Sequence, residues 1–316
     1  MKIVILETTA LNPGDLSWES IKQLGDVTLY DRTTPDLAAQ RIGDAEIILI
    51  NKLPVSAQLM DACPNLRLIA VQATGYNVVD CAAAKERGIL VCNVPAYATT
   101  SVAQFTFALL LEVCHQVGLH NNQVHDGKWA NSPDFCFWST PQTELLGKTI
   151  GIIGYGSIGR AVGRIAKAFG MKVVAYSRTQ YPEYQEDYTD LNTLLAQSDV
   201  VSLHCPLFPE TQKLIGKENI AKMKDGAILI NTSRGPLIDE EAVAEALRTG
   251  KLRAAAVDVA EKEPIAATSP LLTAPNCIIT PHMAWAPLES RQRIMDTLAE
   301  NIRAYQAGAP INVVNP

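Results

Sequence analysis

The chain has 316 residues, 27 basic and 33 acidic side chains, and a formal net charge of −6. That length exceeds the usual size of one hydrophobic core, so we expect two domains. With 47% hydrophobic and 19% charged residues and no basic stripe, the composition is typical of a soluble globular protein and argues against a nucleic-acid partner.

The first residues predict a cytoplasmic protein. Met1 is followed almost at once by strand-like Ile3–Leu6, without a basic and apolar leader, and no uncharged apolar run is long enough to cross a bilayer. We therefore expect no membrane partner. The seven cysteines lack the paired CxxC spacing of a zinc site, so we expect no metal and read them as reduced and buried. They are Cys63, Cys81, Cys92, Cys114, Cys136, Cys205 and Cys277.

Strand-like and helix-like segments alternate over the first part of the chain. The β-rich segments are residues 2–6, 27–30, 46–50, 66–72 and 89–94. Helical patterns lie between them, and this alternation predicts a parallel α/β unit.

An apolar helix and an aromatic loop come next. Residues 101–118, SVAQFTFALLLEVCHQVG, predict a helix too apolar to face water on its outer side. The loop at 133–138, PDFCFW, adds three aromatic rings. Such an apolar arm suggests a subunit interface, and hence a homodimer. The alternative is a core helix within a single chain.

Residues 148–178, KTIGIIGYGSIGRAVGRIAKAFGMKVVAYSR, read as strand, glycine turn, helix and strand. The motif GxGxxG at 154–159 allows a tight turn, close approach of a pyrophosphate and close helix packing. Apolar residues then recur at spacings of three and four as far as Phe169, which indicates one buried helix face. The helix start offers unpaired N–H groups to an anion. The segment therefore predicts a bound dinucleotide, although a glycine turn in an ordinary α/β protein is the alternative.

The second unit continues with strand-like segments at 199–204, 227–231, 254–258 and 277–280. We therefore predict an α/β protein with two doubly wound parallel sheets. Residues 290–307 form an amphipathic pattern that we expect to be a helix crossing back to the first domain. The predicted domains are 1–98 with 287–316, and 99–286, the latter carrying a dimerisation arm at about 101–145.

Three residues that could take part in catalysis follow predicted strands. Arg234 follows 227–231, Glu263 follows 254–258, and His282 follows 277–280. Ligands of parallel sheets bind at the carboxyl ends of the strands.

Hydride transfer to a carbonyl needs a general acid, a cation for the substrate carboxylate, and a group that keeps the acid protonated. Histidine, arginine and glutamate supply these functions. Each residue alone also has a non-catalytic interpretation, because a loop His or Arg is usually a solvated side chain. Glu261 also competes with Glu263 for the acidic role.

Five stretches closely resemble the D-isomer-specific 2-hydroxyacid dehydrogenases, and the resemblance spans essentially the whole chain. They are 154–159, HCPL at 204–207, NTSRG at 231–235, residues 258–264, and TPH at 280–282. Within that family, residues 93–97, 101–104, 135–138 and 282–285 look most like glycerate dehydrogenases, also called hydroxypyruvate reductases.

The resemblance implies a flavodoxin-like substrate domain and a Rossmann cofactor domain with a cleft between them. It also implies that Arg234 binds the substrate carboxylate and carbonyl, that His282 donates the proton in reduction, and that Glu263, rather than Glu261, orients and charges His282.

Further binding residues are expected on the same basis. Backbone groups of Thr74, Gly75 and Tyr76 would hold the carboxylate, and Asp258 would bind the nicotinamide amide. Lys52 would add positive charge to the pocket, with a solvated loop lysine as the equal alternative. Trp138 of a neighbouring subunit would close the pocket, with a core tryptophan as the competing reading. The expected cofactor-binding residues are Gly154, Tyr155, Gly156, Ser157, Ile158, Gly159, Ser177, Arg178, Thr179, His204, Cys205, Pro206, Thr232 and Asp258.

One departure concerns the cofactor. The second strand of a dinucleotide unit usually ends in Asp or Glu, which binds the adenosine ribose. Here Tyr176 is followed by Ser177-Arg178-Thr179, so no carboxylate repels a 2′-phosphate and Arg178 can bind one. We therefore expect NAD(P)H, with NADP(H) favoured over NAD(H).

The predicted function is NAD(P)H-dependent reduction of hydroxypyruvate to D-glycerate, with glyoxylate as a second substrate. The small-molecule partner is thus a 2-keto or 2-hydroxy acid. Another 2-keto acid such as phenylpyruvate is an alternative, whereas a phosphorylated acid is disfavoured because no phosphate-binding cluster is visible. A nicotinamide-responsive corepressor-like scaffold is the alternative from a different class.

Overall fold

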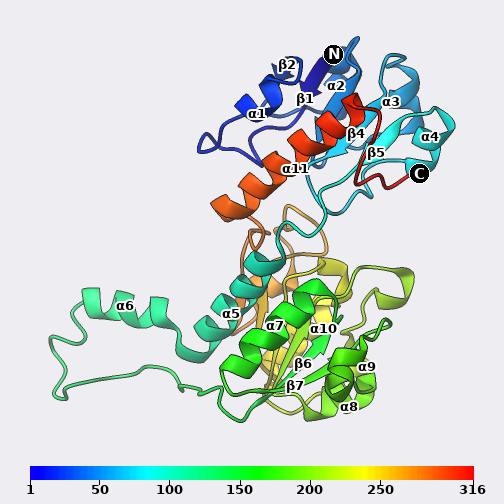
Figure 1. The fold of residues 1–316 in the computed structure, drawn as a ribbon. Coiled ribbons are helices and arrows are strands. Elements are labelled where there is room, and N and C mark those ends of the chain that lie inside the picture. Colours follow the sequence, from blue (N-terminus) through cyan, green and yellow to red (C-terminus); the bar gives the residue numbers. More distant parts are fainter. The chain divides into compact units, whose positions relative to one another are not determined.

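The computed structural model describes all 316 residues, and the chain divides into two compact units. Unit 1 comprises Met1–Ala98 and Trp285–Pro316, and unit 2 comprises Thr99–Ala284. Figure 1 draws both units as a ribbon coloured by residue number.

Unit 1 contains a five-stranded parallel sheet in the order β2-β1-β3-β4-β5, which is the flavodoxin-like order. Its strands are β1 (Lys2–Ile5), β2 (Asp26–Leu29), β3 (Ile47–Ile50), β4 (Leu68–Val71) and β5 (Leu90–Cys92). The helices are α1 (Glu19–Lys22), α2 (Pro35–Ile42), α3 (Ala57–Asp61), α4 (Cys81–Glu86) and α11 (Leu288–Gln306). Every residue of β3 and β4 is buried, as expected for strands that helices cover on both faces.

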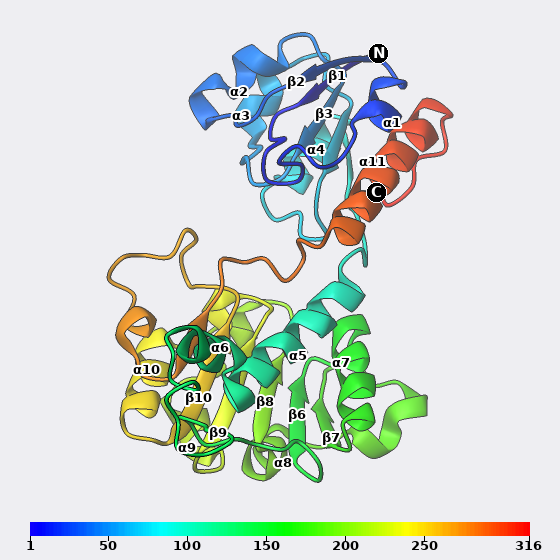
Figure 2. The ribbon, with the colours of Figure 1, turned by 90° about the vertical axis from the view of Figure 1, so that its left-hand side faces the viewer.

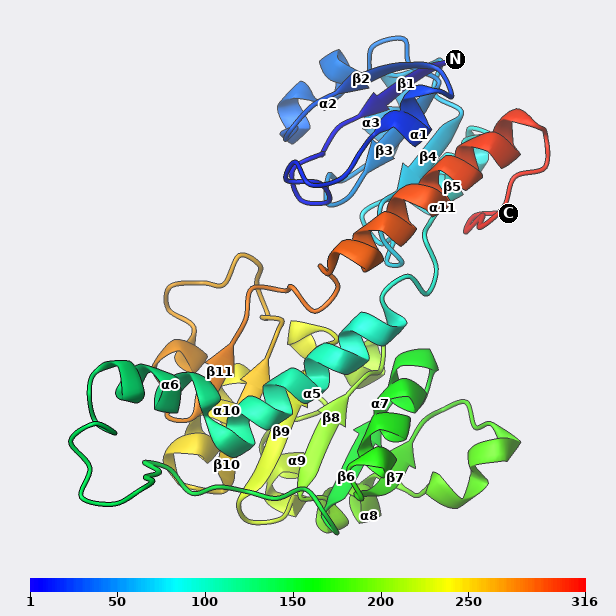
Figure 3. The same cartoon turned by 60° about the vertical axis from the view of Figure 1, so that its left-hand side comes forward.

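The last helix, α11, packs within unit 1 and lies along β4 (Figure 3). Ile294, Leu298 and Ile302 are fully buried along its apolar stripe. Arg291, near its start, forms a two-pronged ion pair with Asp15 at 2.7 and 2.6 Å and also donates to the carbonyls of Leu11 and Ala286. The C-terminal helix is thereby tied to the loop that follows β1.

Unit 2 contains a six-stranded parallel sheet in the order β11-β10-β9-β8-β6-β7. The strands are β6 (Thr149–Ile153), β7 (Lys172–Tyr176), β8 (Val200–Leu203), β9 (Ala227–Asn231), β10 (Leu252–Val257) and β11 (Cys277–Ile279). The order of strand addition reverses between β6 and β8: β7 lies on one side of β6, and β8 to β11 follow on the other. Doubly wound folds bind ligands at such a point. The prediction of two doubly wound parallel sheets is confirmed.

Helices cover both faces of this second sheet (Figure 2). On one face lie α5 (Thr99–His115) and α7 (Ser157–Ala168), whose residues Phe107, Ala161 and Val162 share a core. The other face carries α8 (Leu191–Gln197), α9 (Lys217–Lys222) and α10 (Glu240–Arg248). Short 3₁₀ turns, η1 to η4, occupy Pro182–Asp187, Pro209–Thr211, Gly235–Leu237 and Pro270–Thr273.

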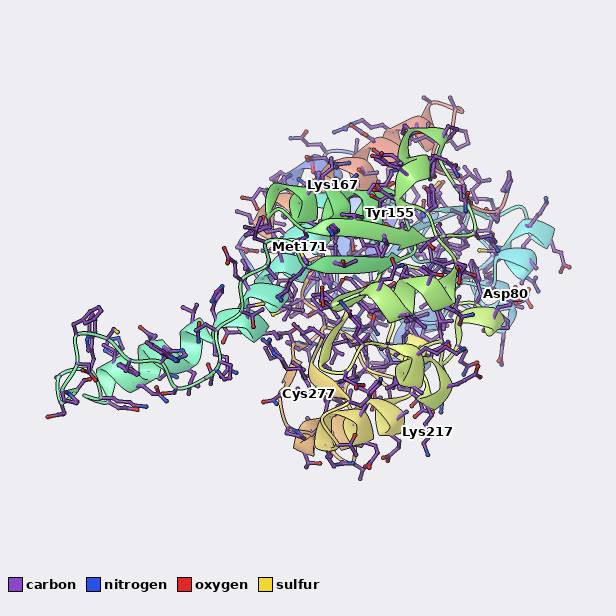
Figure 4. All side chains as sticks on the ribbon, turned by 90° about the horizontal axis from the view of Figure 1, so that it is seen from below. Asp80, Tyr155, Lys167, Met171, Lys217 and Cys277 are labelled. Carbon is purple, nitrogen blue, oxygen red and sulfur yellow. The ribbon has the colours of Figure 1, made fainter.

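The predicted helix at 101–118 was wrong in its extent. Gln116 adopts a left-handed conformation at φ 45°, so α5 ends at His115 and α6 (Val117–His125) begins after a 55° bend. The apolar side chains of α5 pack mainly into the core of unit 2, which is the alternative considered for that helix. Helix α6 buries no residue, and the segment beyond it projects from the body of unit 2 (Figures 1 and 4).

All seven cysteines are free. Four are buried as expected, but Cys81, Cys136 and Cys277 are only half-buried, because the strand, loop and helix positions that carry them lie at the margins of the packed core. No single helix combines the length and apolarity needed to cross a bilayer, and only the bent pair α5 and α6 together reaches that threshold.

Candidate active site

The glycine turn after β6 is shaped for close approach of a phosphate. Gly154 has φ 94°, and a Cβ there would overlap the backbone of His204 and Cys205. A Cβ on Gly159 would overlap the Gly154 carbonyl, whereas a Cβ on Gly156 would meet open space. Helix α7 starts directly after Gly156, and no side chain caps its first N–H groups. The open position at a free helix start fits a dinucleotide pyrophosphate.

Tyr155 lies between the first two glycines, but its side chain points into the protein. Its ring is 1% exposed and passes beneath α7, where its hydroxyl contacts the position of Gly163. That hydroxyl donates to Asp187 Oδ2 at 2.9 Å, and Lys167 pairs with Asp187 Oδ1 at 2.9 Å. Burial raises the pKa of Tyr155, and the Asp187 carboxylate raises it further. Figure 4 labels Tyr155 and Lys167 beside the strands of unit 2. Only the Tyr155 backbone therefore faces the glycine turn.

The loops after β8 and β9 meet beside this turn. His204 Nε2 contacts Ser202 Oγ at 2.8 Å, and burial lowers the pKa of His204 to about 3, so its ring is neutral. Ser233 Oγ donates to the Cys205 carbonyl at 2.7 Å. Thr232 Oγ1 lies 3.1 Å from Thr106 Oγ1 of α5. These contacts hold the backbone near the strand ends in one arrangement.

At the end of β7 the structure places the three residues that replace the usual acid. Ser177 is half-buried, and Arg178 and Thr179 are exposed. The Arg178 guanidinium carbon lies 5.2 Å from the centroid of the Phe208 ring. This end of the sheet therefore presents a cation where a ribose-binding carboxylate is common.

His282 and Glu263 are in direct contact. His282 Nδ1 lies 2.7 Å from Glu263 Oε2, and the two side chains are 30% and 34% exposed. The second oxygen, Oε1, accepts from the Ala260 N–H at 3.3 Å. Because an ionised carboxylate can only accept, Nδ1 is the donor in this contact, and Nε2 makes no hydrogen bond with its own chain.

Asp258 holds the turn that carries His282. Its side chain is fully buried, and its Oδ1 accepts from Thr280 Oγ1 at 2.6 Å and from the Met283 N–H at 2.9 Å. Its Oδ2 accepts from the Ala284 N–H at 2.8 Å. His282, between these anchors, has a positive φ of 54°. The carboxylate thus supports a strained backbone position by three hydrogen bonds.

Arg234 lies in the loop that follows strand β9. Strands β9, β10 and β11 are adjacent in the sheet, and Arg234, Glu263 and His282 follow them in that order. Arg234 is exposed, and its Nη1 donates to the Ser233 carbonyl at 2.8 Å. The next residue, Gly235, packs so tightly on the backbone of Ala260 that a Cβ would overlap the Ala260 carbonyl. The turn bearing Arg234 therefore rests on the loop that leads to Glu263.

The candidate residues of unit 1 lie at the ends of β3 and β4. Lys52 and Tyr76 are exposed, Tyr76 to 40%, and Thr74 Oγ1 donates to the Val94 carbonyl at 2.7 Å. Gly75 is half-buried between Thr74 and Tyr76. These loops follow β3 and β4, which are neighbours in the sheet of unit 1.

Trp138 lies on the arm and not in a core, because its side chain is 68% exposed. It lines a surface hollow together with His120, Trp129 and Phe137. The structure does not bring Trp138 into contact with Glu263 or His282.

The sequence did not reveal two acidic residues that brace these loops. Glu7 Oε2 accepts three backbone N–H groups, from Asn51, Lys52 and Leu53, at 2.7 to 2.9 Å. Glu240, only 8% exposed, accepts from the Glu261 N–H at 2.8 Å and from Ser269 Oγ at 2.6 Å. For Glu7, the one sequence feature that could have indicated this role is its position directly after a strand. The position of Glu240 in the first turn of a helix is typical of a solvated acid.

Comparison with known proteins agrees with this geometry. The family described as D-isomer specific 2-hydroxyacid dehydrogenase, NAD binding domain, matches residues 107–284. A hydroxypyruvate reductase of Blautia hydrogenotrophica is 54% identical, covering 100% of both chains. A glycerate dehydrogenase of Methylorubrum extorquens is 44% identical over 90% of each chain, and a glyoxylate reductase of Korarchaeum cryptofilum is 39% identical over 86% of this chain and 82% of its own.

Solved structures are similar along the whole length. An acyclic imino acid reductase in complex with NADPH and D-Arg has a TM-score of 0.85 at 31% identity, covering 99% of this chain and 100% of its own. A D-lactate dehydrogenase from Aquifex aeolicus, complexed with NAD and lactic acid, has a TM-score of 0.84 at 31% identity, covering 100% of this chain and 99% of its own. The protein belongs to the D-isomer-specific 2-hydroxyacid dehydrogenases, nicotinamide-dependent oxidoreductases that act on CH–OH groups.

Proposed function

We propose that this enzyme reduces hydroxypyruvate to D-glycerate, and glyoxylate to glycolate, with NAD(P)H as the reductant. The observation that carries the proposal is the 2.7 Å contact between His282 Nδ1 and Glu263 Oε2, one strand from Arg234 on the dinucleotide-binding sheet. The relatives with these activities in their names supply the substrate class.

His282 is the proposed proton donor. When bound, the reduced nicotinamide supplies a hydride to C2 of the keto acid. The carbonyl oxygen then takes a proton from His282 Nε2, and the imidazole regains one from solvent, so the alcohol forms with atoms and charge balanced. Glu263 orients the ring through its contact with Nδ1.

Arg234 is the proposed binding group for the substrate carboxylate. Its guanidinium is exposed and makes one hydrogen bond, to the Ser233 carbonyl, which leaves most of its five N–H donors for a ligand. A planar fork matches a carboxylate with two parallel hydrogen bonds. We propose that backbone groups of Thr74, Gly75 and Tyr76, together with Lys52, contribute further donors from unit 1.

Asp258 has a proposed second role beside its structural one. Its Oδ2 accepts one hydrogen bond, from Ala284, and retains capacity to accept another. We propose that it accepts the nicotinamide amide, and that the backbone of 154–159, 204–206 and Thr232 surrounds the rest of the dinucleotide.

We further propose that the enzyme prefers NADP(H) to NAD(H). The support is the sequence Ser177-Arg178-Thr179 at the end of β7, with an exposed guanidinium and two hydroxyls where a carboxylate is common. The substitution Arg178→Ala tests it. The KM for NADPH is expected to rise much more than the KM for NADH, and equal changes in both would contradict the preference.

A homodimer formed through the arm is the proposed assembly. Trp129, Phe135 and Trp138 on this segment are 51%, 90% and 68% exposed, and α6 buries nothing in its own chain. We propose that the arm, about 101–145, packs on a second copy and that Trp138 closes the substrate pocket of the partner subunit. Light scattering on Phe135→Ser should show a weakened dimer; an unchanged mass would contradict this assembly.

We propose a cytoplasmic location because none of the seven cysteines is paired, as is usual in a reducing compartment. Cell fractionation tests this proposal, and recovery from an oxidising compartment would contradict it.

A steady-state assay with hydroxypyruvate, glyoxylate, phenylpyruvate and 3-phosphohydroxypyruvate, each with NADPH and NADH, tests the activity. The highest kcat/KM is expected for hydroxypyruvate. A higher value for another acid would contradict the substrate, and absence of turnover on all four would contradict catalysis and favour a binding scaffold.

A further inference from the structure

Phe208 places an aromatic ring beside the only cation at the end of β7. Arg178 follows β7, and its guanidinium carbon lies 5.2 Å from the centroid of the Phe208 ring. Strands β7 and β8 are the two neighbours of β6, so the loops that carry these residues flank the glycine turn. The ring is 40% exposed, so one part of it is packed and another part is accessible to the guanidinium.

The turn that carries Phe208 is held in one shape. Thr211 Oγ1 accepts from the Phe208 N–H at 2.7 Å and lies 2.9 Å from the Pro206 carbonyl. The N–H groups of Thr211 and Gln212 donate to the Phe208 carbonyl at 3.0 and 3.1 Å. Because the backbone at Phe208 is hydrogen-bonded on both sides, the turn presents the ring from a defined backbone position.

A cation over an aromatic ring is held through its flat face. The N–H groups of a guanidinium lie in its own plane and point outward from its edge, so stacking leaves them free for an anion. The Arg178 guanidinium makes no hydrogen bond or ion pair with its own chain, and its carbon lies over the Phe208 ring. The contact therefore orders a long, exposed side chain without using its donors.

We propose that Phe208 is a specificity-determining residue, because its ring positions the Arg178 guanidinium to bind the 2′-phosphate that distinguishes NADP(H) from NAD(H). This inference rests on the proposed NADP(H) preference. Phe208 acts through Arg178, so it is a positioning residue. Its effect falls on ligands with a 2′-phosphate and leaves those with a free 2′-hydroxyl unchanged.

The test measures binding of two nucleotide fragments to the unliganded enzyme by calorimetry. Adenosine 2′,5′-bisphosphate carries the 2′-phosphate, and adenosine 5′-monophosphate lacks it. In Phe208→Leu, which keeps an apolar side chain but removes the ring, the Kd for the bisphosphate is expected to rise about two- to fivefold. The Kd for the monophosphate is expected to stay the same. Phe208→Trp keeps a ring and should restore the wild-type preference.

A double substitution separates positioning from direct contact. If the ring acts only through Arg178, then Arg178→Ala with Phe208→Leu binds the bisphosphate no more weakly than Arg178→Ala alone. Melting temperatures of all variants establish that each is folded before binding is compared.

The outcomes distinguish this inference from the function beneath it. If the wild-type enzyme binds both fragments equally, the proposed NADP(H) preference is wrong, and the proposed role of Phe208 is wrong as well. If the wild-type enzyme prefers the bisphosphate and Phe208→Leu keeps that preference, only the role of Phe208 is overturned. Equal weakening of both fragments would also overturn it, because the ring would then contact the adenosine itself.

Discussion

Glu263 Oε2 lies 2.7 Å from His282 Nδ1, although the two residues come from loops after different strands. The contact leaves Nε2 as the exchangeable nitrogen of the ring.

Replacing Glu263 by Gln should lower kcat for hydroxypyruvate reduction by about tenfold to a hundredfold, within the range attributed to a general acid. The amide carries no charge, so its hydrogen bond to Nδ1 is weaker and the ring is held less firmly. Glu261→Gln is the matched control, because Glu261 is exposed and its side chain makes no hydrogen bond. A kcat for Glu263→Gln equal to that of wild type would argue against the pairing.

Thr280→Val should weaken catalysis by loosening the His282 turn. The substitution removes one of three donors to the buried Asp258 carboxylate, which should cost about 1–3 kcal/mol of unfolding free energy. We also expect kcat to fall, because the turn that carries His282 is held less firmly. Urea unfolding and steady-state kinetics measure the two quantities, and unchanged stability would show that this hydrogen bond is not important.

Arg234→Lys should raise the KM for hydroxypyruvate by about tenfold to a hundredfold, because a lysine ammonium cannot form two parallel hydrogen bonds to a carboxylate. Arg248→Lys serves as the control, since Arg248 is paired with Glu245 on the surface of α10 at 3.6 Å. Steady-state kinetics distinguish the two variants. Equal KM values for wild type and Arg234→Lys would remove Arg234 from the binding site.

Two glycines of one motif should respond differently to alanine. Gly156 has open space at its Cβ position, so Gly156→Ala should fold normally but bind NADPH more weakly, because the methyl group occupies the approach to the helix start. Gly159→Ala would overlap the Gly154 carbonyl and should lower the melting temperature. Thermal scans with and without NADPH separate these effects; similar behaviour of both variants would contradict the assigned roles.

The Asp15–Arg291 pair should make stability depend on acid. The hydrogen bond from Arg291 lowers the pKa of Asp15 below its ordinary value. The stabilisation is therefore present above the unfolded pKa, about 3.9, and is lost as pH falls through the lowered folded pKa. Asp15→Asn should unfold more easily than wild type at pH 7, and the difference should shrink in acid. A difference that is constant with pH would contradict the linkage.

The local pattern of the chain was enough to predict much of this protein. The glycine spacing at 154–159, the apolar strands and the amphipathic helix at 290–307 depend on neighbouring residues, so the sequence alone indicates a dinucleotide fold and two parallel sheets. The sequence also marked Arg234, Glu263 and His282 as candidates, because each follows a predicted strand, although only the family resemblance chose Glu263 over Glu261.

Tertiary structure decided which groups touch. Helix α5 ends at His115, before the left-handed Gln116, and its apolar surface packs on α7 and the sheet. Tyr155 turns inward because Gly163 leaves room beneath the helix, and Glu7 captures three N–H groups of a loop more than forty residues away. These outcomes depend on packing and on hydrogen bonds between segments distant in sequence, since a buried polar group must find whichever partner the fold brings near.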